Sequence, residues 1–500
     1  MKFATDKISK KEIIFSIIFF TCVIFGVLLG FGTITSGLHM VDDHEFWRFN
    51  VYLDEGQNLR DMIVERLQGD MSWRFRPLYY PIRLVISAIF GTNLVLMSVL
   101  KGIETVLACV VIYFVARKLR CTPVYSIFTT FFVLAGSQSS VWWKLGPQEL
   151  TCTWMFGMGI LFLLIWHENK KPIFNVLSIF FVLIASLYKE SYLALIPTVM
   201  LIYIYFDMEG KEVTWKNFWK TVRNNLASEI ALGVIILVEA YMILFVVGAG
   251  NVSYISADDS TTLWFYIKMF LNNFRLHLRV GQQGFYVIAL IIIFRKELKK
   301  LLMELRWQFL LACVMVLPQF ILYAKSGLEE RYVIPWIYGV AYFFCAVLSK
   351  SELIKGQKRR LFNIALAVLT TVNFLLVFYE AGYFTYRGKG IAAMFDAVCE
   401  IADEDTKILS AYFPYDESET TCAIYLQSRG VTSVYAYRDG IGTDWWRVGE
   451  GTTISPEEAD IILTYNFNDR HFVSEPDLDF SDYDITIFNT MRMAVRKDRN

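Results

Sequence analysis

Long apolar runs dominate the chain and limit what it can fold into. Most are at or near the length of about 20 residues that a helix needs to cross a bilayer, the run at 284–294 is shorter, and polar segments separate them. We therefore expect a bundle of about eleven transmembrane helices. The runs lie at 13–36, 94–116, 124–141, 150–166, 173–188, 191–206, 229–249, 284–294, 307–325, 332–349 and 361–379.

The composition supports this class of protein. Apolar residues make up 55% of the 500 residues and charged residues only 19%, whereas an average soluble domain has about 45–50% and about 25%. These values exclude a disordered chain, a collagen-like repeat and a typical soluble enzyme. The 48 Lys and Arg residues balance the 48 Asp and Glu residues, which excludes a basic nucleic-acid-binding protein.

The basic residues indicate the orientation of the helices, because Lys and Arg accumulate in cytoplasmic loops. If the N-terminus is cytoplasmic, every loop placed inside is basic, and the longer outside loops are poorer in Lys and Arg. The run at 78–92 contains Pro81 and Arg83, so we interpret it as an amphipathic helix on the membrane surface. The prediction is a multi-pass protein of the cell (plasma) membrane with its N-terminus in the cytoplasm.

The chain changes character near residue 381, where polar and acidic residues return. Residues 1–380 are predicted to form the membrane domain, with a first outside loop at 37–93, and residues 381–500 a small extracytoplasmic α/β domain. The fold class is thus an all-α polytopic membrane bundle with an α/β appendage. In the tail we expect helices at 390–402 and 422–430 and strands at 406–412, 431–437, 459–465 and 484–490.

Four ionisable residues begin the first outside loop, directly after the first predicted helix. They are Asp42, Asp43, His44 and Glu45. Ionisable groups at a membrane face are solvated, paired or functional. Neighbouring carboxylates disfavour each other's ionisation, which suits one of them to act as a general base. The simpler alternative is a solvated loop start or a helix cap.

Further along this loop, residues 54–68 have helical spacing, with Leu59, Met62, Ile63 and Leu67 on one face, as in a helix lying on the membrane. Arg74, Arg76 and Arg83 follow. A guanidinium can bind an anionic head group or phosphate in a bidentate manner. For Arg74 and Arg83 we favour the alternative that they contact lipid phosphates as membrane anchors.

Three shorter outside loops place charged side chains at the same membrane face. The first contains Lys144 and Glu149, the second contains Lys189 and Glu190, and the third contains Glu329, Glu330, Arg331 and Tyr332. Arg331 starts a predicted helix on its outer side, where it can reach a lipid-linked phosphate. A simple turn at Lys189 and an interfacial anchor at Arg331 are the alternatives.

Together these features resemble the GT-C superfamily of membrane glycosyltransferases, and most of all its protein O-mannosyltransferase and lipid A aminoarabinose transferase branches. The motifs are the acidic pair in the first loop, the surface helix, the segment RPLYYPIRLVISAIFG, KES between two helices and RYVIP at the start of a late helix. Each motif is short, but their order and placement over residues 10–380 make the resemblance specific.

The resemblance implies a hexosyltransferase-type enzyme that transfers a sugar from a polyprenyl-phosphate donor to an acceptor outside the membrane, with inversion. The partners would be this donor, membrane lipids and a cell-surface glycan, lipid or protein, and no nucleic acid. Asp42 or Asp43 matches the position of the base. Some relatives use a divalent metal, but we predict that none is essential. The expected substrate-binding residues are His44, Glu45, Arg76, Glu149, Lys189, Glu190, Arg331 and Tyr332.

Other classes of membrane protein are weaker alternatives. A flippase or transporter is expected to carry inverted repeats and broken helices at mid-membrane, and the sequence has no evident repeat. A lipid-linked polysaccharide polymerase is expected to place its main functional residues in a large later loop, whereas the acidic pair lies in the first. A non-catalytic scaffold leaves the acidic residues unexplained.

Overall fold

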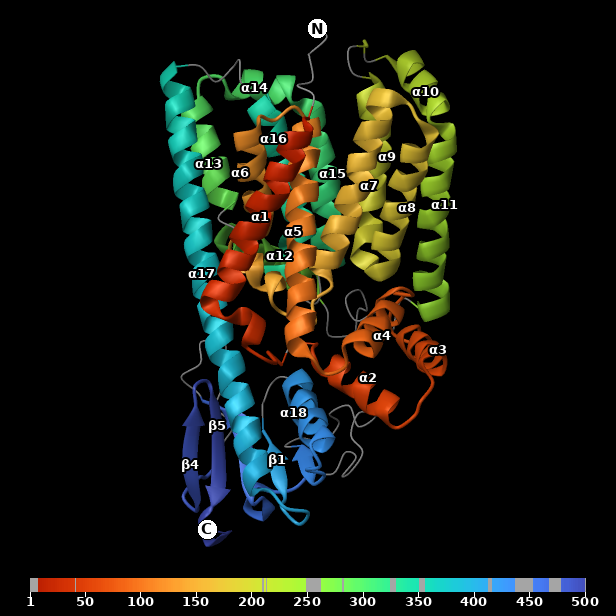
Figure 1. Cartoon of the computed structure of the whole chain (residues 1–500). Coiled ribbons are helices and arrows are strands. Elements are labelled where there is room, and N and C mark those ends of the chain that lie inside the picture. Colours follow the sequence, from red (N-terminus) through yellow and green to blue (C-terminus); the bar gives the residue numbers. More distant parts are fainter. Residues whose placement is uncertain are drawn as a thin grey trace.

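Each predicted apolar run contains a helix in the computed structural model. The structure describes residues 8–40, 42–208, 211–212, 214–248, 262–280, 283–323, 330–349, 356–411, 416–436, 453–466 and 478–499. The helices stand roughly side by side in a bundle (Figure 1). They are α1 (Lys10–Phe31), α5 (Leu94–Lys118), α6 (Pro123–Leu134), α7 (Glu149–Asn169), α8 (Pro172–Tyr188), α9 (Ile196–Met208), α11 (Leu226–Tyr241), α13 (Gln283–Phe294), α15 (Arg306–Leu322), α16 (Ile334–Ser349) and α17 (Gly356–Ile401).

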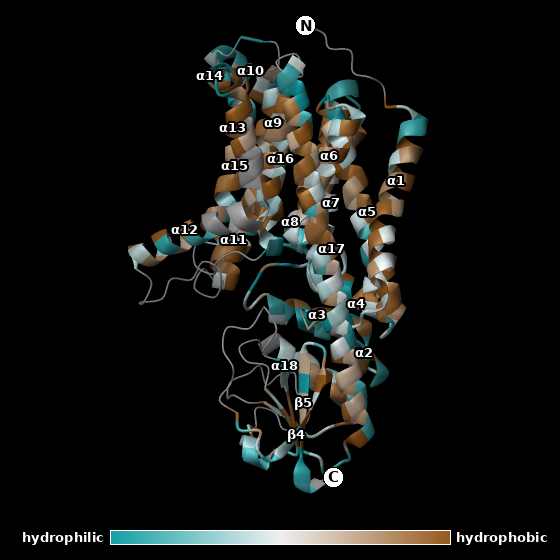
Figure 2. Cartoon of the chain, turned by 90° about the vertical axis from the view of Figure 1, so that its left-hand side faces the viewer, coloured by the Kyte–Doolittle hydropathy of each residue, from teal (hydrophilic) through white to brown (hydrophobic). Residues whose placement is uncertain are grey.

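The chain is a multi-pass membrane protein. Among the described residues, seven helical segments are long and apolar enough to cross a bilayer, and an eighth is added if α14 (Leu298–Glu304) and α15, which meet at 76°, form one bent span. Helices α6 and α8 are apolar but shorter, so the number eleven stays a prediction. Apolar residues cover the middle of the bundle and polar residues its ends (Figure 2).

Glycines allow α7 to pack closely between its neighbours. A Cβ atom on Gly157 would lie 2.7 Å from the Val111 side chain of α5 and 2.8 Å from the Tyr338 hydroxyl of α16. A Cβ atom on Gly159 would lie 2.7 Å from Val182 of α8. Small residues at such contacts let membrane helices approach each other. The start of α7, which carries Glu149, is therefore held firmly inside the bundle.

The segment between α1 and α5, which contains the predicted first outside loop, folds as short helices at the end of the bundle opposite the N-terminus (Figure 1). They are η1 (Thr33–Thr35), α2 (His44–Asp54), α3 (Leu59–Asp70) and α4 (Tyr79–Phe90). Helix α4 has only 12 residues, about 18 Å at 1.5 Å per residue, so it is too short to span. Met62 of α3 is buried against Phe49 of α2 and Leu84 of α4, as expected from the apolar face of α3.

The C-terminal part folds around a five-stranded sheet with the order β2-β1-β3-β5-β4. The strands are β1 (Ile408–Ser410), β2 (Val434–Ala436), β3 (Ile461–Tyr465), β4 (Tyr483–Phe488) and β5 (Met491–Arg496). The first three are parallel, and β5 pairs antiparallel with β3 and β4. Helix α18 (Asp416–Ser428) lies between the sheet and the first outside loop (Figure 1). The four predicted strands are confirmed, and the sequence analysis missed β5.

Helix α17 joins the two parts of the molecule without interruption. It runs for 46 residues from the bundle into the C-terminal domain, so the predicted boundary between residues 380 and 381 falls inside a continuous helix. The composition changes there because α17 leaves the bundle, not because the chain turns. The remaining helices are η2 (Ser137–Trp142), η3 (Glu190–Leu195), α10 (Trp215–Asn224), η4 (Met242–Gly248), α12 (Leu263–Val280), η5 (Glu330–Val333), η8 (Pro456–Glu458) and η9 (Lys497–Arg499).

Candidate active site

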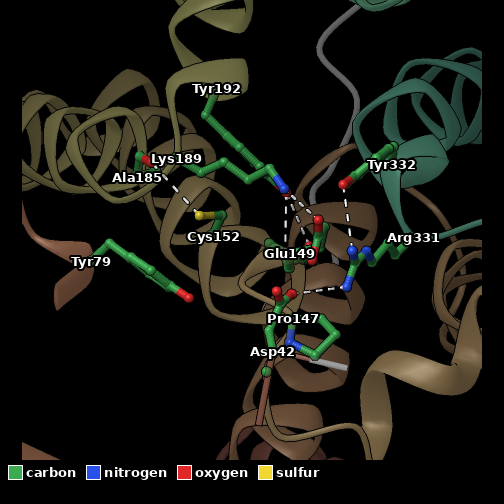
Figure 3. A network of polar contacts seen from close by, with 12 residues as sticks. Asp42, Tyr79, Pro147, Glu149, Cys152, Ala185, Lys189, Tyr192, Arg331 and Tyr332 are labelled. Atoms are coloured by element: carbon green, nitrogen blue, oxygen red, sulfur yellow. Dashed lines mark hydrogen bonds and ion pairs between the residues drawn. The ribbon is translucent and has the colours of Figure 1, made fainter. Parts of the chain in front are cut away.

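A cavity of about 190 Å³ lies where the first outside loop meets the bundle (Figure 3). Segments far apart in the sequence line it, and most of the lining side chains are charged. The lining residues are Asp42, Glu45, Arg74, Arg76, Tyr79, Pro147, Gln148, Glu149, Lys189, Arg331 and Tyr332. The structure thus brings together seven of the predicted site residues, while Asp43, His44 and Glu190 lie outside this lining.

Asp42 lies in the loop between α1 and α2 in an unusual backbone conformation, with φ +53°. Its carbonyl oxygen accepts a hydrogen bond of 2.6 Å from the Arg83 guanidinium. Its carboxylate Oδ2 lies 3.2 Å from Nη1 of Arg331, which is 289 positions away in the chain. The Asp42 side chain keeps 27% of its surface exposed. The carboxylate is therefore held near a cation and remains open to the cavity.

The neighbouring Asp43 has a different environment. It is fully buried, and its Oδ2 accepts a hydrogen bond of 2.6 Å from the His39 amide. Burial, together with the charges of Lys144 and Arg387, lowers the pKa of His39 to about 3, and burial also lowers the pKa of His44. Both histidines are therefore neutral at physiological pH. Asp43 does not line the cavity, and its hydrogen bond with the His39 amide stabilises the loop.

Arg83 contacts three residues that line the cavity, Asp42, Glu45 and Tyr79, although it is not part of the lining itself. Its guanidinium is 2% exposed and its Nε lies 3.0 Å from Oε2 of Glu45. The same guanidinium donates to the Tyr79 hydroxyl and to the Gly146 carbonyl, and Tyr79 in turn donates to Glu45 at 2.8 Å. The interpretation of Arg83 as an anchor to lipid phosphates is therefore wrong. The spacing of Tyr79 and Arg83, one helical turn apart, was the signal that these side chains share a face.

Arg76 is held by Asp70 at the end of α3. Two contacts join them, 2.5 Å from Nη2 to Oδ1 and 3.2 Å from Nε to Oδ2, and the guanidinium lies 4.4 Å from the Tyr79 ring centre. Burial disfavours the charged form, but Asp70 and Glu190 more than offset it and hold the pKa of Arg76 well above its usual value. Arg74, also interpreted as a lipid anchor, lines the same cavity.

Glu149 and Lys189 form the bundle side of the cavity (Figure 3). The Lys189 ammonium donates to Oε1 of Glu149 and lies 4.7 Å from the ring centre of Tyr332. The other carboxylate oxygen of Glu149, Oε2, is buried and has no hydrogen-bond partner among the described residues. An unpaired buried oxygen is costly, so this atom is suited to accept a hydrogen bond from a bound molecule.

The loop before α7 and the stacked tyrosines complete the cavity wall. Lys101 of α5 donates to the Pro147 carbonyl at 2.7 Å, which fixes the loop in front of Glu149. Tyr332 stacks on Tyr323 at 4.9 Å and receives a contact of 3.4 Å from Arg331. Sequence reasoning singled out this loop for Lys144 and Glu149 but missed Pro147 and Gln148, because these two residues carry no distinctive motif.

The balance of charge suits binding of a phosphate group. Four cationic side chains line the cavity, and each of Arg76, Lys189 and Arg331 pairs with a carboxylate. An incoming phosphate can displace such a carboxylate and accept the hydrogen bonds of the guanidinium in its place. Among the described residues, no group of three or more His, Cys, Asp and Glu side chains has the arrangement of a metal site.

Comparison with known proteins identifies solved structures of similar fold. No protein-family model and no curated protein matches the sequence. Two crystal structures of ArnT from Cupriavidus metallidurans match with a TM-score of 0.51, over 95% of this chain and 97% of that one. One is bound to undecaprenyl phosphate, at 14% identity, and the other is in the apo state, at 13% identity. This chain therefore has an ArnT-like membrane fold.

Proposed function

We propose that the protein is an integral membrane glycosyltransferase that transfers a sugar from a polyprenyl-phosphate donor to an acceptor outside the cytoplasm, with inversion. The observation that carries this proposal is the exposed Asp42 carboxylate beside Arg331 in a cavity lined by three further cations. This arrangement combines a general base with a phosphate-binding site at one end of a membrane bundle. The match to a protein that binds undecaprenyl phosphate supports the choice of donor.

The proposed reaction follows from these positions. A hydroxyl or amine of the acceptor attacks the anomeric carbon, and Asp42 receives its proton. The bond from that carbon to the phosphate oxygen breaks on the opposite face, which inverts the anomeric configuration. The phosphate leaves with its bonding electrons, and Arg331 and Lys189 stabilise its developing negative charge. Arg76 and Arg74 extend the cationic wall for the same phosphate.

The ion pair between Asp42 and Arg331 gives the donor a role beyond supplying the sugar. In the structure Nη1 of Arg331 lies 3.2 Å from the Asp42 carboxylate. A donor phosphate that binds Arg331 would compete with this contact and free the Asp42 carboxylate to accept a proton. We assign Asp43 to positioning, since its carboxylate is buried against the His39 amide.

We further propose that the cavity and the C-terminal domain face the outside of the plasma membrane, while the N-terminus is cytoplasmic. The first outside loop and the C-terminal domain share one end of the bundle, and the N-terminus lies at the other (Figure 1). The basic loops fall on the N-terminal side, as expected for cytoplasmic loops.

The test compares wild-type protein with Asp42→Asn, and uses Glu65→Gln as a control because Glu65 is an exposed acid of the same loop. Mass spectrometry of cell-surface glycans, lipids and proteins should show a sugar that is lost without the protein. We expect Glu65→Gln to restore it and Asp42→Asn not to. Purified Asp42→Asn should still be stabilised against heat by undecaprenyl phosphate, because the cations remain. Restoration by Asp42→Asn would exclude Asp42 as the base.

A further inference from the structure

We propose that the C-terminal domain holds Asp42 in its catalytic position, so that the domain and the Asp42 loop (residues 36–43) form one unit. This inference rests on the proposed role of Asp42. Two residues of the loop, Leu38 and Met40, are 3% and 2% exposed, and they belong to the hydrophobic core of the C-terminal domain. That core also contains Met394 of α17, Leu426 of α18 and Met493 of β5.

The backbone of the Asp42 loop needs such support. Met40 has φ +56° and Asp42 has φ +53°, in the left-handed region that residues other than glycine rarely adopt. Conformations of this kind persist only where the surroundings enforce them. The Met40 side chain is fixed in the domain core, and the Asp42 carbonyl is fixed by Arg83. The domain and the first outside loop thus restrain the two ends of the strained segment.

Helix α17 also presses on the start of the loop. A Cβ atom on Gly388 would lie 2.3 Å from the carbonyl oxygen of Ser36, so any larger residue must displace the loop backbone. The Ser36 hydroxyl contacts the His39 ring at 2.9 Å, and the His39 amide donates to Asp43. A displacement at Gly388 is therefore passed along directly bonded groups to Asp43, the residue after Asp42.

A third contact lies on the other side of Asp42. Trp47 of α2 meets the ring of Tyr425 of α18 edge to face, with 4.9 Å between ring centres. The C-terminal domain thus contacts the chain at Leu38 and Met40 before Asp42 and at Trp47 after it. Contacts on both sides fix the position of the carboxylate between them better than a contact on one side.

The test uses two variants that disturb this contact and two matched controls. Met40→Ala removes the buried side chain, while Met40→Leu keeps its volume. Gly388→Ala forces a clash with backbone, whereas a Cβ atom on Gly382 of the same helix would lie 3.7 Å from Phe31, an ordinary contact. Hydrogen exchange over residues 36–43 reports the loop directly. It needs no substrate, so it tests the contact even if Asp42 proves not to be the base.

We expect Met40→Ala and Gly388→Ala to speed exchange in residues 36–43 about tenfold or more and to reduce sugar transfer, while undecaprenyl phosphate still stabilises both proteins. Met40→Leu and Gly382→Ala should behave as wild type. If Met40→Ala does not accumulate, Gly388→Ala decides the question. Unchanged exchange in Gly388→Ala, or faster exchange with full transfer, overturns the proposal.

Discussion

The charged side chains at the cavity and those that contact them are held in different ways. On the first-loop side, the pairs Arg83–Glu45 and Arg76–Asp70 are buried and joined by several hydrogen bonds. On the bundle side, Lys189 pairs with the buried Glu149, whereas the contact between Arg331 and Asp42 leaves the Asp42 side chain 27% exposed. The comparison separates a rigid framework from groups that can exchange partners with a ligand. The predictions below test this division, from the largest expected effect to the smallest.

Arg83→Met should destabilise the protein most, because it leaves Glu45 charged and buried. Breaking a buried pair typically costs about 3–5 kcal/mol, and we expect a loss of this size in the free energy of unfolding, measured by denaturation in detergent. The double variant Arg83→Met/Glu45→Leu should recover much of the stability. Equal stability of Arg83→Met and wild type would show that this side is not a framework.

Arg331→Gln should affect ligand binding and leave the fold intact. Asp42 is partly exposed, so its carboxylate can be solvated when Arg331 is absent. A hydrogen bond to a charged group contributes about 1.5–3 kcal/mol, or roughly 10- to 100-fold in affinity. We expect undecaprenyl phosphate to bind more weakly by this factor in a titration of thermal stability. A lower melting temperature with unchanged phosphate binding would place Arg331 in the framework instead.

Low pH should destabilise the folded protein through His39. Its pKa is about 3 in the folded protein and about 6.5 in the unfolded chain. The unfolded state therefore binds the proton first, and stability falls as the pH drops below about 6.5, by about 2 kcal/mol at pH 5. His39→Gln should remove most of this slope in melting curves recorded between pH 5 and pH 8. A parallel slope in both proteins would assign the effect to other groups.

Glu190→Gln should have the smallest effect. Glu190 follows Lys189 directly in the sequence but is absent from the cavity lining, so the change should alter phosphate binding by less than about threefold, within about 0.5 kcal/mol. Glu149→Gln is the matched comparison, since Glu149 lines the cavity and pairs with Lys189. A larger effect of Glu190→Gln than of Glu149→Gln would reverse the assignment of these two acids.

The sequence predicted the fold well where the physical signal is local. Apolar runs and their basic flanks mark the helices, and the spacing of Leu59 and Met62 marks a surface helix. The end of the membrane domain was harder, because α17 stays helical while its environment changes from lipid to protein. Strand β5, with the sequence MRMAVR, has two arginines among its six residues and was passed over.

The site was predicted as a set of residues but not as a geometry. Charged side chains at one membrane face indicated Asp42, Lys189 and Arg331, and the structure places all three at one cavity. The sequence could not distinguish Asp42 from Asp43, because their environments depend on the direction of a single loop. Nor could it show that Arg83 points inward, since lipid and protein are equally available to an arginine at a helix surface.

The contact of Leu38 and Met40 with the C-terminal domain has a consequence for the order of synthesis. These residues leave the ribosome long before their partner Met493, which lies more than 450 positions later in the sequence. The membrane bundle can therefore insert long before the loop of Asp42 acquires its final surroundings. A chain that stops short of β5 would enter the membrane with the cations proposed to bind the donor phosphate in place, but with its proposed base unsupported. Synthesis of β5 is thus the step that allows the Asp42 loop to reach its final surroundings.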